Sequence, residues 1–161
     1  MSDLPSVYVL VDDRELEGDI PLLRQINPNP AANNVDWEDL DAGGFPRLRS
    51  AAFQRASKKI ASQEGYPEQT LSVYLERVVL DSYGSVEAWL RVVGRPGYGV
   101  ARVTAQQLRQ LGSLSLRRDD HRGFIGHCVG WAAESGSKSR AGEPALAEVA
   151  EWVVKPQHTT A

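Results

Sequence analysis

The chain has 161 residues, of which 42% are hydrophobic, and this suits a single globular domain over residues 1–161 with a modest core. No apolar run is long enough to cross a bilayer, so no transmembrane helix is expected. The opening MSDLPSVYVLVDDRE lacks the basic start and small-residue cleavage site of a signal peptide, and the single cysteine, Cys128, excludes an internal disulfide framework. We therefore expect a cytoplasmic protein that does not contact a membrane.

The net charge of −3 conceals an uneven distribution. Residues 1–45 contain ten acidic and two basic residues, whereas residues 46–140 contain fifteen basic and eight acidic residues. The acidic opening and the basic body can pair with each other in the fold, or the basic body can face an anionic ligand such as a nucleotide, or an acidic partner. Sequence-specific nucleic-acid binding is not indicated, because no basic cluster is interleaved with aromatic residues.

The first part of the chain predicts two short strands and one helix. Apolar residues indicate strands over residues 6–11 and 20–26. Asn and Pro then favour a loop over residues 27–46, with one helical turn around Trp37. A stripe of apolar residues indicates a helix over residues 47–62.

The segment TLSVYLER, residues 70–77, predicts a strand over 70–76, although its apolar residues also fit one side of a helix. Its Thr, Val and Tyr content favours the strand. In a strand, the side chains of Ser72, Tyr74 and Glu76 lie opposite the apolar ones. These polar groups form either a solvated face or the floor of a polar cleft.

Helices and strands alternate irregularly in the second part of the chain. Ser85 and Thr104 are good helix caps and predict helices over 85–94 and 104–112, each ended by a glycine. The other expected elements are strands over 99–103 and 124–133, an extended segment over 113–118 and a helix over 144–154. This order predicts a single-domain α+β fold with a small mixed or antiparallel sheet and three to four helices. We expect residues 1–19 to be a loosely attached acidic segment and residues 156–161 to be a frayed tail.

Arg24 is the clearest candidate for a functional residue. In LLRQI it shares one face of a predicted strand with Leu22 and Ile26. A guanidinium among apolar neighbours needs a partner, because burying an unpaired charge costs several kcal/mol. The partner is either a carboxylate from the acidic opening or an anionic ligand.

The cysteine and histidines give weaker indications. Cys128 lies between two glycines in GHCVG, a pattern that some hydrolases use for a nucleophile, but no helix is predicted to follow it. A small buried thiol explains it better. His127 and Cys128 point to opposite sides of a strand, and only two other histidines are present, so we expect no metal site.

Six short segments follow one another in a distinctive order: PLLRQINP (21–28), SAAF (50–53), LSVYL (71–75), PGYGVARVTA (96–105), HCVGW (127–131) and AEWVV (150–154). Their order and spacing resemble a family of small uncharacterised bacterial proteins. The resemblance covers most of residues 20–155 and implies a stand-alone domain, without bringing an established activity.

An arginine on an early strand, a serine on a later extended segment and a subsequent glutamate are more remotely similar to the ADP-ribosyltransferase-like folds, including the RES-type NAD-degrading toxins of bacterial defence. This resemblance implies that Arg24 would hold the pyrophosphate of NAD, since a guanidinium fork matches phosphate geometry. Ser50 or Tyr74 would line the nicotinamide pocket, and Glu76 would stabilise the positive charge that develops at the ribose.

Three functional hypotheses follow from the sequence. The first is an accessory domain without a cofactor that binds a protein partner or an anionic nucleotide-like ligand through Arg24, Tyr74 and His127. The second is an NAD-using transferase or glycohydrolase, with Arg24, Ser50, Tyr74 and Glu76 as catalytic candidates. The third is a nucleic-acid accessory factor that uses the basic segment 47–59.

Overall fold

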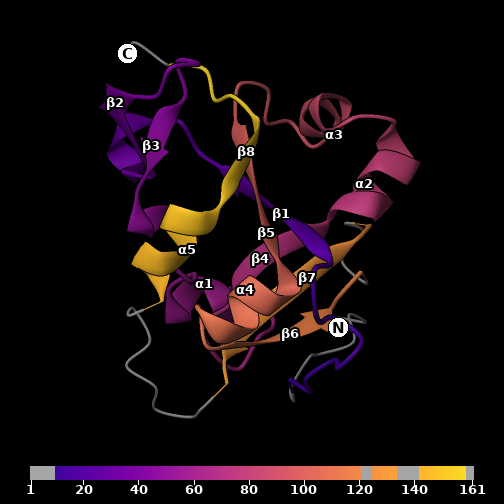
Figure 1. Cartoon of the computed structure of the whole chain (residues 1–161). Helices are drawn as coiled ribbons and strands as arrows, with labels where there is room; N and C mark the ends of the chain where they lie inside the picture. The colour runs from indigo at the N-terminus through magenta and orange to yellow at the C-terminus, as the bar shows by residue number, and fades with distance from the viewer. Residues whose placement is uncertain (1–9, 121–124, 134–141, 159–161) are drawn as a thin grey trace.

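The computed structural model describes residues 10–120, 125–133 and 142–158, which form an α+β fold around one six-stranded sheet (Figure 1). The strand order is β6-β7-β4-β1-β5-β8, and every pair of neighbours is antiparallel. The strands are β1 (Pro21–Ile26), β4 (Leu71–Leu75), β5 (Gly99–Thr104), β6 (Leu114–Arg118), β7 (His127–Ala132) and β8 (Glu151–Val154). The predicted α+β class is confirmed, with the antiparallel form of the sheet.

Five short α-helices occur in the described residues, one more than the largest number expected. They are α1 (Lys58–Gln63), α2 (Glu76–Tyr83), α3 (Val86–Val92), α4 (Ala105–Gln110) and α5 (Glu143–Val149). Both predicted caps are confirmed: the hydroxyls of Ser85 and Thr104 accept the backbone N–H of Ala88 and Gln107. None of the helices in the described ranges has the length and apolar character needed to span a bilayer.

The loop expected over residues 27–46 is wrong in its second half. Residues 35–40 form a strand, β2 (Val35–Leu40), which pairs with β3 (Pro46–Leu48) in a separate two-stranded sheet. The Asp41 carboxylate accepts the N–H groups of Gly43 and Phe45 and so closes the turn between the strands. The sequence does not predict this hairpin, because β2 is acidic and lacks an apolar face: only Val35 is buried, and its other residues are partly or fully exposed.

The single helix expected over residues 47–62 is also wrong. The segment contains most of β3, a 3₁₀ helix η2 (Ser50–Phe53) and, after an extended link, all of α1 except Gln63. Burial of Ala52 and Phe53 fixes η2 against the core, and the extended link after it donates the Ala56 N–H to Thr70 O at 2.8 Å. Packing and this backbone bond therefore override the helical periodicity of the sequence.

The helix expected over residues 144–154 ends early, at Val149. Ala150 is extended, with ψ 142°, and the next four residues form β8 beside β5. The Trp152 indole N–H donates to Pro46 O at 3.0 Å, which ties β8 to the small sheet. The strand expected over residues 6–11 falls mostly outside the described residues, and Leu10 and Val11 are not in a strand.

The two faces of the large sheet are covered differently. One face packs under η2, α4 and α5 in the main core, which includes Leu22, Val73 and Leu116. The other face carries two smaller clusters. One includes Trp89 of α3 and residues of α2, and the other includes Trp131 and Ala61 of α1. Polar side chains of β4 and β7 lie on this second face, where we find the candidate site.

The strand expected over residues 70–76 is confirmed as β4, but it ends at Leu75, and the next residue, Glu76, begins α2.

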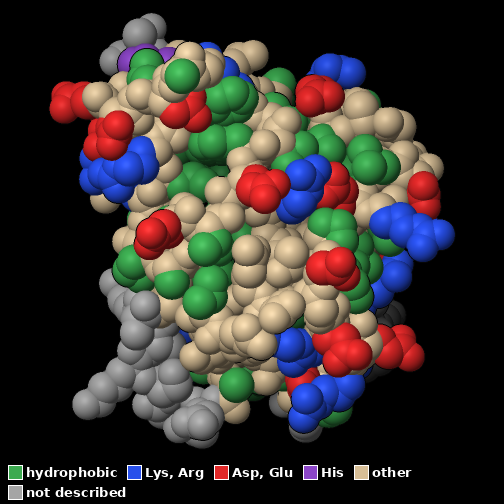
Figure 2. Space-filling model, viewed as in Figure 1, with side chains coloured by type: hydrophobic (Ala, Val, Ile, Leu, Met, Phe, Trp, Pro, Cys, Tyr) green, Lys and Arg blue, Asp and Glu red, His purple; other side chains and the backbone are tan. Residues whose placement is uncertain are grey.

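Figure 1 shows α2 and α3 next to each other on one side of the view and the β2–β3 hairpin on the other. On the face drawn in Figure 2, acidic and basic side chains are interspersed rather than gathered by sign.

Candidate functional site

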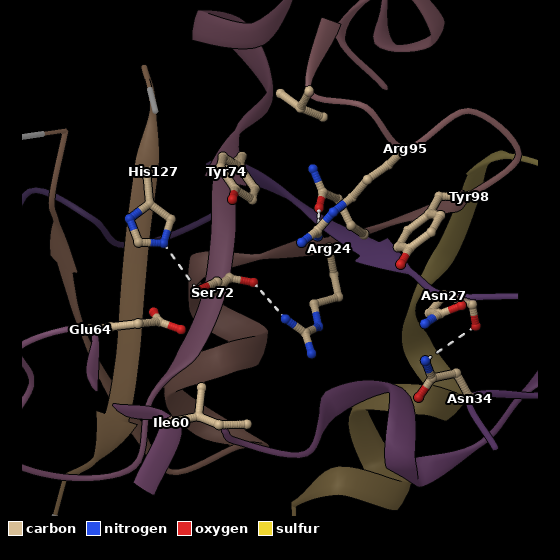
Figure 3. A pocket seen from close by; sticks show the side chains of 12 residues that line it. Arg24, Asn27, Asn34, Ile60, Glu64, Ser72, Tyr74, Arg95, Tyr98 and His127 are labelled. Carbon is tan, nitrogen blue, oxygen red and sulfur yellow. Dashed lines mark hydrogen bonds between the residues drawn. The ribbon is translucent and has the colours of Figure 1, made fainter. Parts of the chain in front are cut away.

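A cavity of about 720 Å³ opens on the second face of the sheet, beside Tyr74 of the α2–α3 cluster and Ile60 of α1 (Figure 3). Residues from β1, β4, β7 and the loop after α3 line it. The side chains that matter for its chemistry are Arg24, Ser72, Tyr74, Arg95, Tyr98 and His127. The structure therefore brings Arg24, Tyr74 and His127 together, as the first hypothesis requires.

Arg24 reaches this cavity through a gap between two strands. Pairing of β1 with β4 ends at Leu23 and Tyr74, and beyond that point the Arg24 guanidinium lies between the backbones. Its Nε–H donates to Ala52 O at 2.9 Å and its Nη1 donates to Ser72 O at 3.0 Å. The side chain thus substitutes for the missing ladder hydrogen bonds and holds the gap open.

The Arg24 guanidinium has no carboxylate partner among the described residues. A guanidinium has five N–H donors, and the two bonds to carbonyl oxygens leave three of them. Burial lowers the pKa of Arg24 to about 10, so the group is still charged at neutral pH. Three acids of the N-terminal region pair elsewhere: Asp12 with Arg109, and Asp36 and Asp39 with Arg47.

Arg95 adds a second positive charge to the cavity. It lies in the loop between α3 and β5, where it donates to the Gln25 side chain and stands 5.4 Å from the centroid of the Tyr98 ring. Glu64 is the one carboxylate among the described residues that line the cavity. With two guanidiniums and one carboxylate, the cavity carries a net positive charge.

Ser72 and His127 form a hydrogen-bonded pair on the floor of the cavity. His127 Nε2 lies 3.0 Å from Ser72 Oγ, and Nδ1 lies 3.1 Å from the backbone oxygen of Asp119. Because a carbonyl oxygen only accepts hydrogen bonds, Nδ1 carries the proton and Nε2 accepts the serine hydroxyl. Burial lowers the pKa of His127, so the ring is neutral at pH 7.

The Tyr74 ring lies between the His127 ring and Trp89 of the α2–α3 cluster. Its ring meets that of Trp89 edge-on at 4.9 Å and lies 5.2 Å from His127. Burial raises the pKa of the phenol, which therefore remains protonated and can donate a hydrogen bond. Figure 3 shows the hydroxyl directed towards the cavity.

Two of the predicted site residues lie elsewhere. Glu76 forms a two-bond ion pair with Arg102, at 2.5 and 2.6 Å, outside the cavity. Ser50 is exposed at the start of η2, in a different hollow beside α5. The two departures have separate causes. β4 ends before Glu76, which begins α2, and Ser50 begins η2 beside α5 instead of lying in a strand next to β4.

Cys128 is fully buried in the main core, and burial raises its pKa to about 12, which is typical of an unreactive thiol. No group of three or more His, Cys, Asp or Glu in the described ranges is placed to hold a metal ion. His121 lies outside the described residues, and His158 stacks on Trp37 at 4.4 Å, away from the cavity.

Sequence reasoning did not find Arg95, Tyr98 and Glu64, and it treated Ser72 only as part of a polar face. Arg95 and Tyr98 lie in RPGYG, a sequence that predicts a tight turn. Pairing of β1 with β5, which places Gly99 opposite Ile26, brings this turn towards the end of β1 that carries Arg24. Predicting from the sequence that β1 pairs with β5 would have shown that Arg95 and Tyr98 lie near Arg24.

These observations define a class: an α+β domain with a positively charged cavity on an antiparallel sheet and a Ser–His pair at its base. Comparison of the chain with protein-family models, curated proteins and solved structures found no match.

Proposed function

We propose that the protein binds a small anionic ligand of the nucleotide class in the cavity around Arg24. The observation that carries the proposal is the guanidinium itself, which is charged, partly buried and without a carboxylate partner in the described residues. A partly buried guanidinium whose charge no carboxylate balances is stabilised by an anion that the protein binds. Arg95 supplies a second charge for the same anion.

Other lining groups favour a nucleotide over a simple inorganic anion. Tyr98 and Tyr74 present aromatic rings to the cavity, and Asn27 and Asn34 bring amide groups near its rim. Aromatic rings stack on bases and amides hydrogen-bond their edges. The volume of about 720 Å³ lies in the range of small-molecule pockets.

Titration of the purified protein with AMP, ADP, ATP, NAD and pyrophosphate tests the proposal, with adenosine as the uncharged comparison. Calorimetry should give saturable binding of at least one phosphorylated compound and none of adenosine. Ligand at 100 times its Kd should stabilise the fold by about 2.7 kcal/mol.

The variants Arg95→Gln and Arg24→Lys should each weaken binding at least tenfold, because each loses a guanidinium that faces the anion. Arg77→Gln, on an exposed arginine of α2, is the matched control and should bind like the wild type. The proposal is rejected if no phosphorylated compound binds at millimolar concentration, or if Arg95→Gln and Arg24→Lys both retain wild-type affinity.

Use of NAD is a second candidate function, favoured by the presence of an acid in the same cavity as Arg24 and Tyr74. That acid is Glu64 rather than Glu76. If NAD is a substrate, chromatography should show release of nicotinamide, and Glu64→Gln should abolish it while Glu76→Gln should not. Nicotinamide that stays below the buffer control over several hours excludes this activity.

The other two partner classes have less support. The basic segment 47–59 is not one helix, and Arg47 pairs with Asp36 and Asp39, which reduces the charge available to nucleic acid. An acidic peptide of a protein partner offers Arg24 the same chemistry as a nucleotide. Competition between a bound nucleotide and a glutamate-rich peptide would distinguish the two.

A further inference from the structure

The Ser72–His127 pair has the arrangement of a nucleophile and its base. The serine hydroxyl donates to the neutral Nε2, and the other ring nitrogen is held by the Asp119 carbonyl oxygen. A base oriented by a third group, and within hydrogen-bond reach of a hydroxyl, is the recurring structural mark of an activated nucleophile. Nothing in the binding function proposed above requires this orientation.

The position of the pair also suits a reaction. Ser72 is half-buried and opens to the cavity, whereas His127 is only 4% exposed and lies behind it. In Figure 3 Ser72 is placed between His127 on one side and Arg24 on the other. Remaining N–H groups of Arg24 are available to stabilise negative charge that develops next to the serine.

We propose that Ser72 is a catalytic nucleophile that hydrolyses carboxylic esters carrying an anionic group, with His127 as the general base. The choice of an anionic ester rests on the proposed function, because it assigns the anion to Arg24 and Arg95. The reactivity of the serine does not rest on it.

The reaction balances without a further co-reactant. Ser72 Oγ forms a bond to the ester carbonyl carbon while its proton moves to His127 Nε2. The bond from that carbon to the alcohol oxygen then breaks, and the alcohol leaves with the proton from His127. Water, activated by His127 in the same way, cleaves the acyl-serine to give a carboxylic acid and restores the Ser72 hydroxyl.

The reactivity is tested first with a neutral reagent, so that the result does not depend on anion binding. Wild-type protein is treated with a fluorophosphonate, which displaces fluoride and leaves a phosphonyl group on an activated serine. Intact mass should show one added phosphonyl group, and peptide mapping should place it on Ser72. Ser72→Ala should remain unlabelled, and Ser82→Ala, on an exposed serine of α2, should label normally.

Turnover is tested with 4-nitrophenyl acetate and with the anionic mono-4-nitrophenyl ester of succinic acid. Ser72→Ala and His127→Gln should each lower nitrophenolate release at least 100-fold, the range expected for loss of the nucleophile or general base. Arg95→Gln should reduce release from the anionic ester alone. Circular dichroism shows whether the His127 variant is folded. If that variant does not fold, labelling of the wild-type protein still tests the proposal, because it requires no substitution.

The outcomes separate the two proposals. A fluorophosphonate that leaves the protein unmodified, or that labels a serine other than Ser72, overturns the catalytic assignment whatever the nucleotide titration gives. Labelling of Ser72 together with equal rates for both esters in wild type and in Arg95→Gln keeps the nucleophile but overturns the choice of an anionic substrate.

Discussion

At the scale of single residues, Arg24 shows how a charged side chain can lie between apolar neighbours. By strand alternation it belongs to the main-core face with Leu22 and Ile26. Because pairing with β4 has already ended at Leu23, the guanidinium passes into the gap between the strands and bonds two carbonyl oxygens there. The arginine is therefore both a structural bridge and the charge at the base of the cavity.

The sequence alone indicates that Arg24 needs a partner, because its guanidinium shares a strand face with Leu22 and Ile26. It was not sufficient to distinguish an acid of the N-terminal region from a ligand, because that depends on which acids the fold pairs elsewhere. Arg95 could not be selected, since a turn residue acquires its role only through the neighbouring strand. Glu76 was assigned by alternation, which fails at the residue where the helix begins.

His127 makes the stability of the fold depend on pH. Burial lowers its pKa in the folded state, so the unfolded chain, with a pKa of about 6.5, binds the proton more readily. The contribution of the neutral ring is complete above about pH 6.5. It is lost as the pH falls from there towards the lower folded pKa.

We therefore expect the free energy of unfolding, measured with urea, to fall between pH 7.5 and pH 5. The fall should be smaller in His127→Gln, which has no ring to protonate. Asp120 contributes a loss of its own only under more acidic conditions: Arg118 lowers its pKa, so the stabilisation that Asp120 provides is complete above the usual pKa range of an aspartate and is lost below it. Equal pH dependence in the two proteins would show that His127 is not responsible.

At the scale of elements, local chemistry predicted where helices begin better than where they end. Ser85 and Thr104 occupy the cap positions expected of them, since a hydroxyl cap acts within one turn and needs no tertiary contact. The change from α5 to β8 depends instead on distant partners. β8 pairs with β5, and the Trp152 indole reaches Pro46, more than one hundred residues away in the chain.

Gly99 illustrates the same dependence on tertiary contacts. A Cβ atom at this position would lie 2.7 Å from the Trp152 ring and 3.0 Å from Pro156. The absence of a side chain there allows the segment that contains β8 to approach β5. No local pattern in GYGVA reveals this, because the glycine is also a plausible turn residue.

Thr104 offers a test of capping in α4. Its hydroxyl accepts the Gln107 N–H at 3.1 Å, and the Gln107 side chain accepts the Thr104 N–H at 3.0 Å. Thr104→Ala should lower the free energy of unfolding by about 1 kcal/mol, as for other hydroxyl caps. Thr104→Ser keeps the acceptor and should lose less than half as much in the same urea titration, whereas equal losses would contradict a capping role.

At the scale of the whole molecule, acidic residues of the N-terminal region pair with basic residues further along the chain, both within one hairpin and across nearly one hundred residues. Asp12 pairs with Arg109, and Asp36 and Asp39 pair with Arg47. This pairing uses acids that were candidates for Arg24 and leaves the cavity positive. The uneven charge distribution of the sequence thus has a structural role, and the anion site proposed above uses the positive charge that this pairing leaves.

Residues 12–16 are tied to the body of the protein mainly through Arg109. Its guanidinium donates to the Asp12 carboxylate at 2.8 Å and to the backbone oxygens of Asp13 and Leu16 at 2.7 Å each. The Leu116 N–H donates to the same Asp12 carboxylate, and Leu16 is buried in the main core. Arg109, the backbone of Leu116 and the burial of Leu16 together attach a segment that the sequence alone predicts to be loosely attached.

Arg109→Ala should release this segment while leaving the sheet and the cavity in place. Hydrogen bonds to charged groups contribute about 2 kcal/mol, so we expect a loss of that order in the free energy of unfolding. Hydrogen exchange should rise at residues 10–16 and stay unchanged in β4 and β7, because Arg109 contacts neither strand. Arg91→Ala, on an exposed arginine of α3, is the control. Faster exchange throughout the sheet would instead show that this segment and the core unfold together.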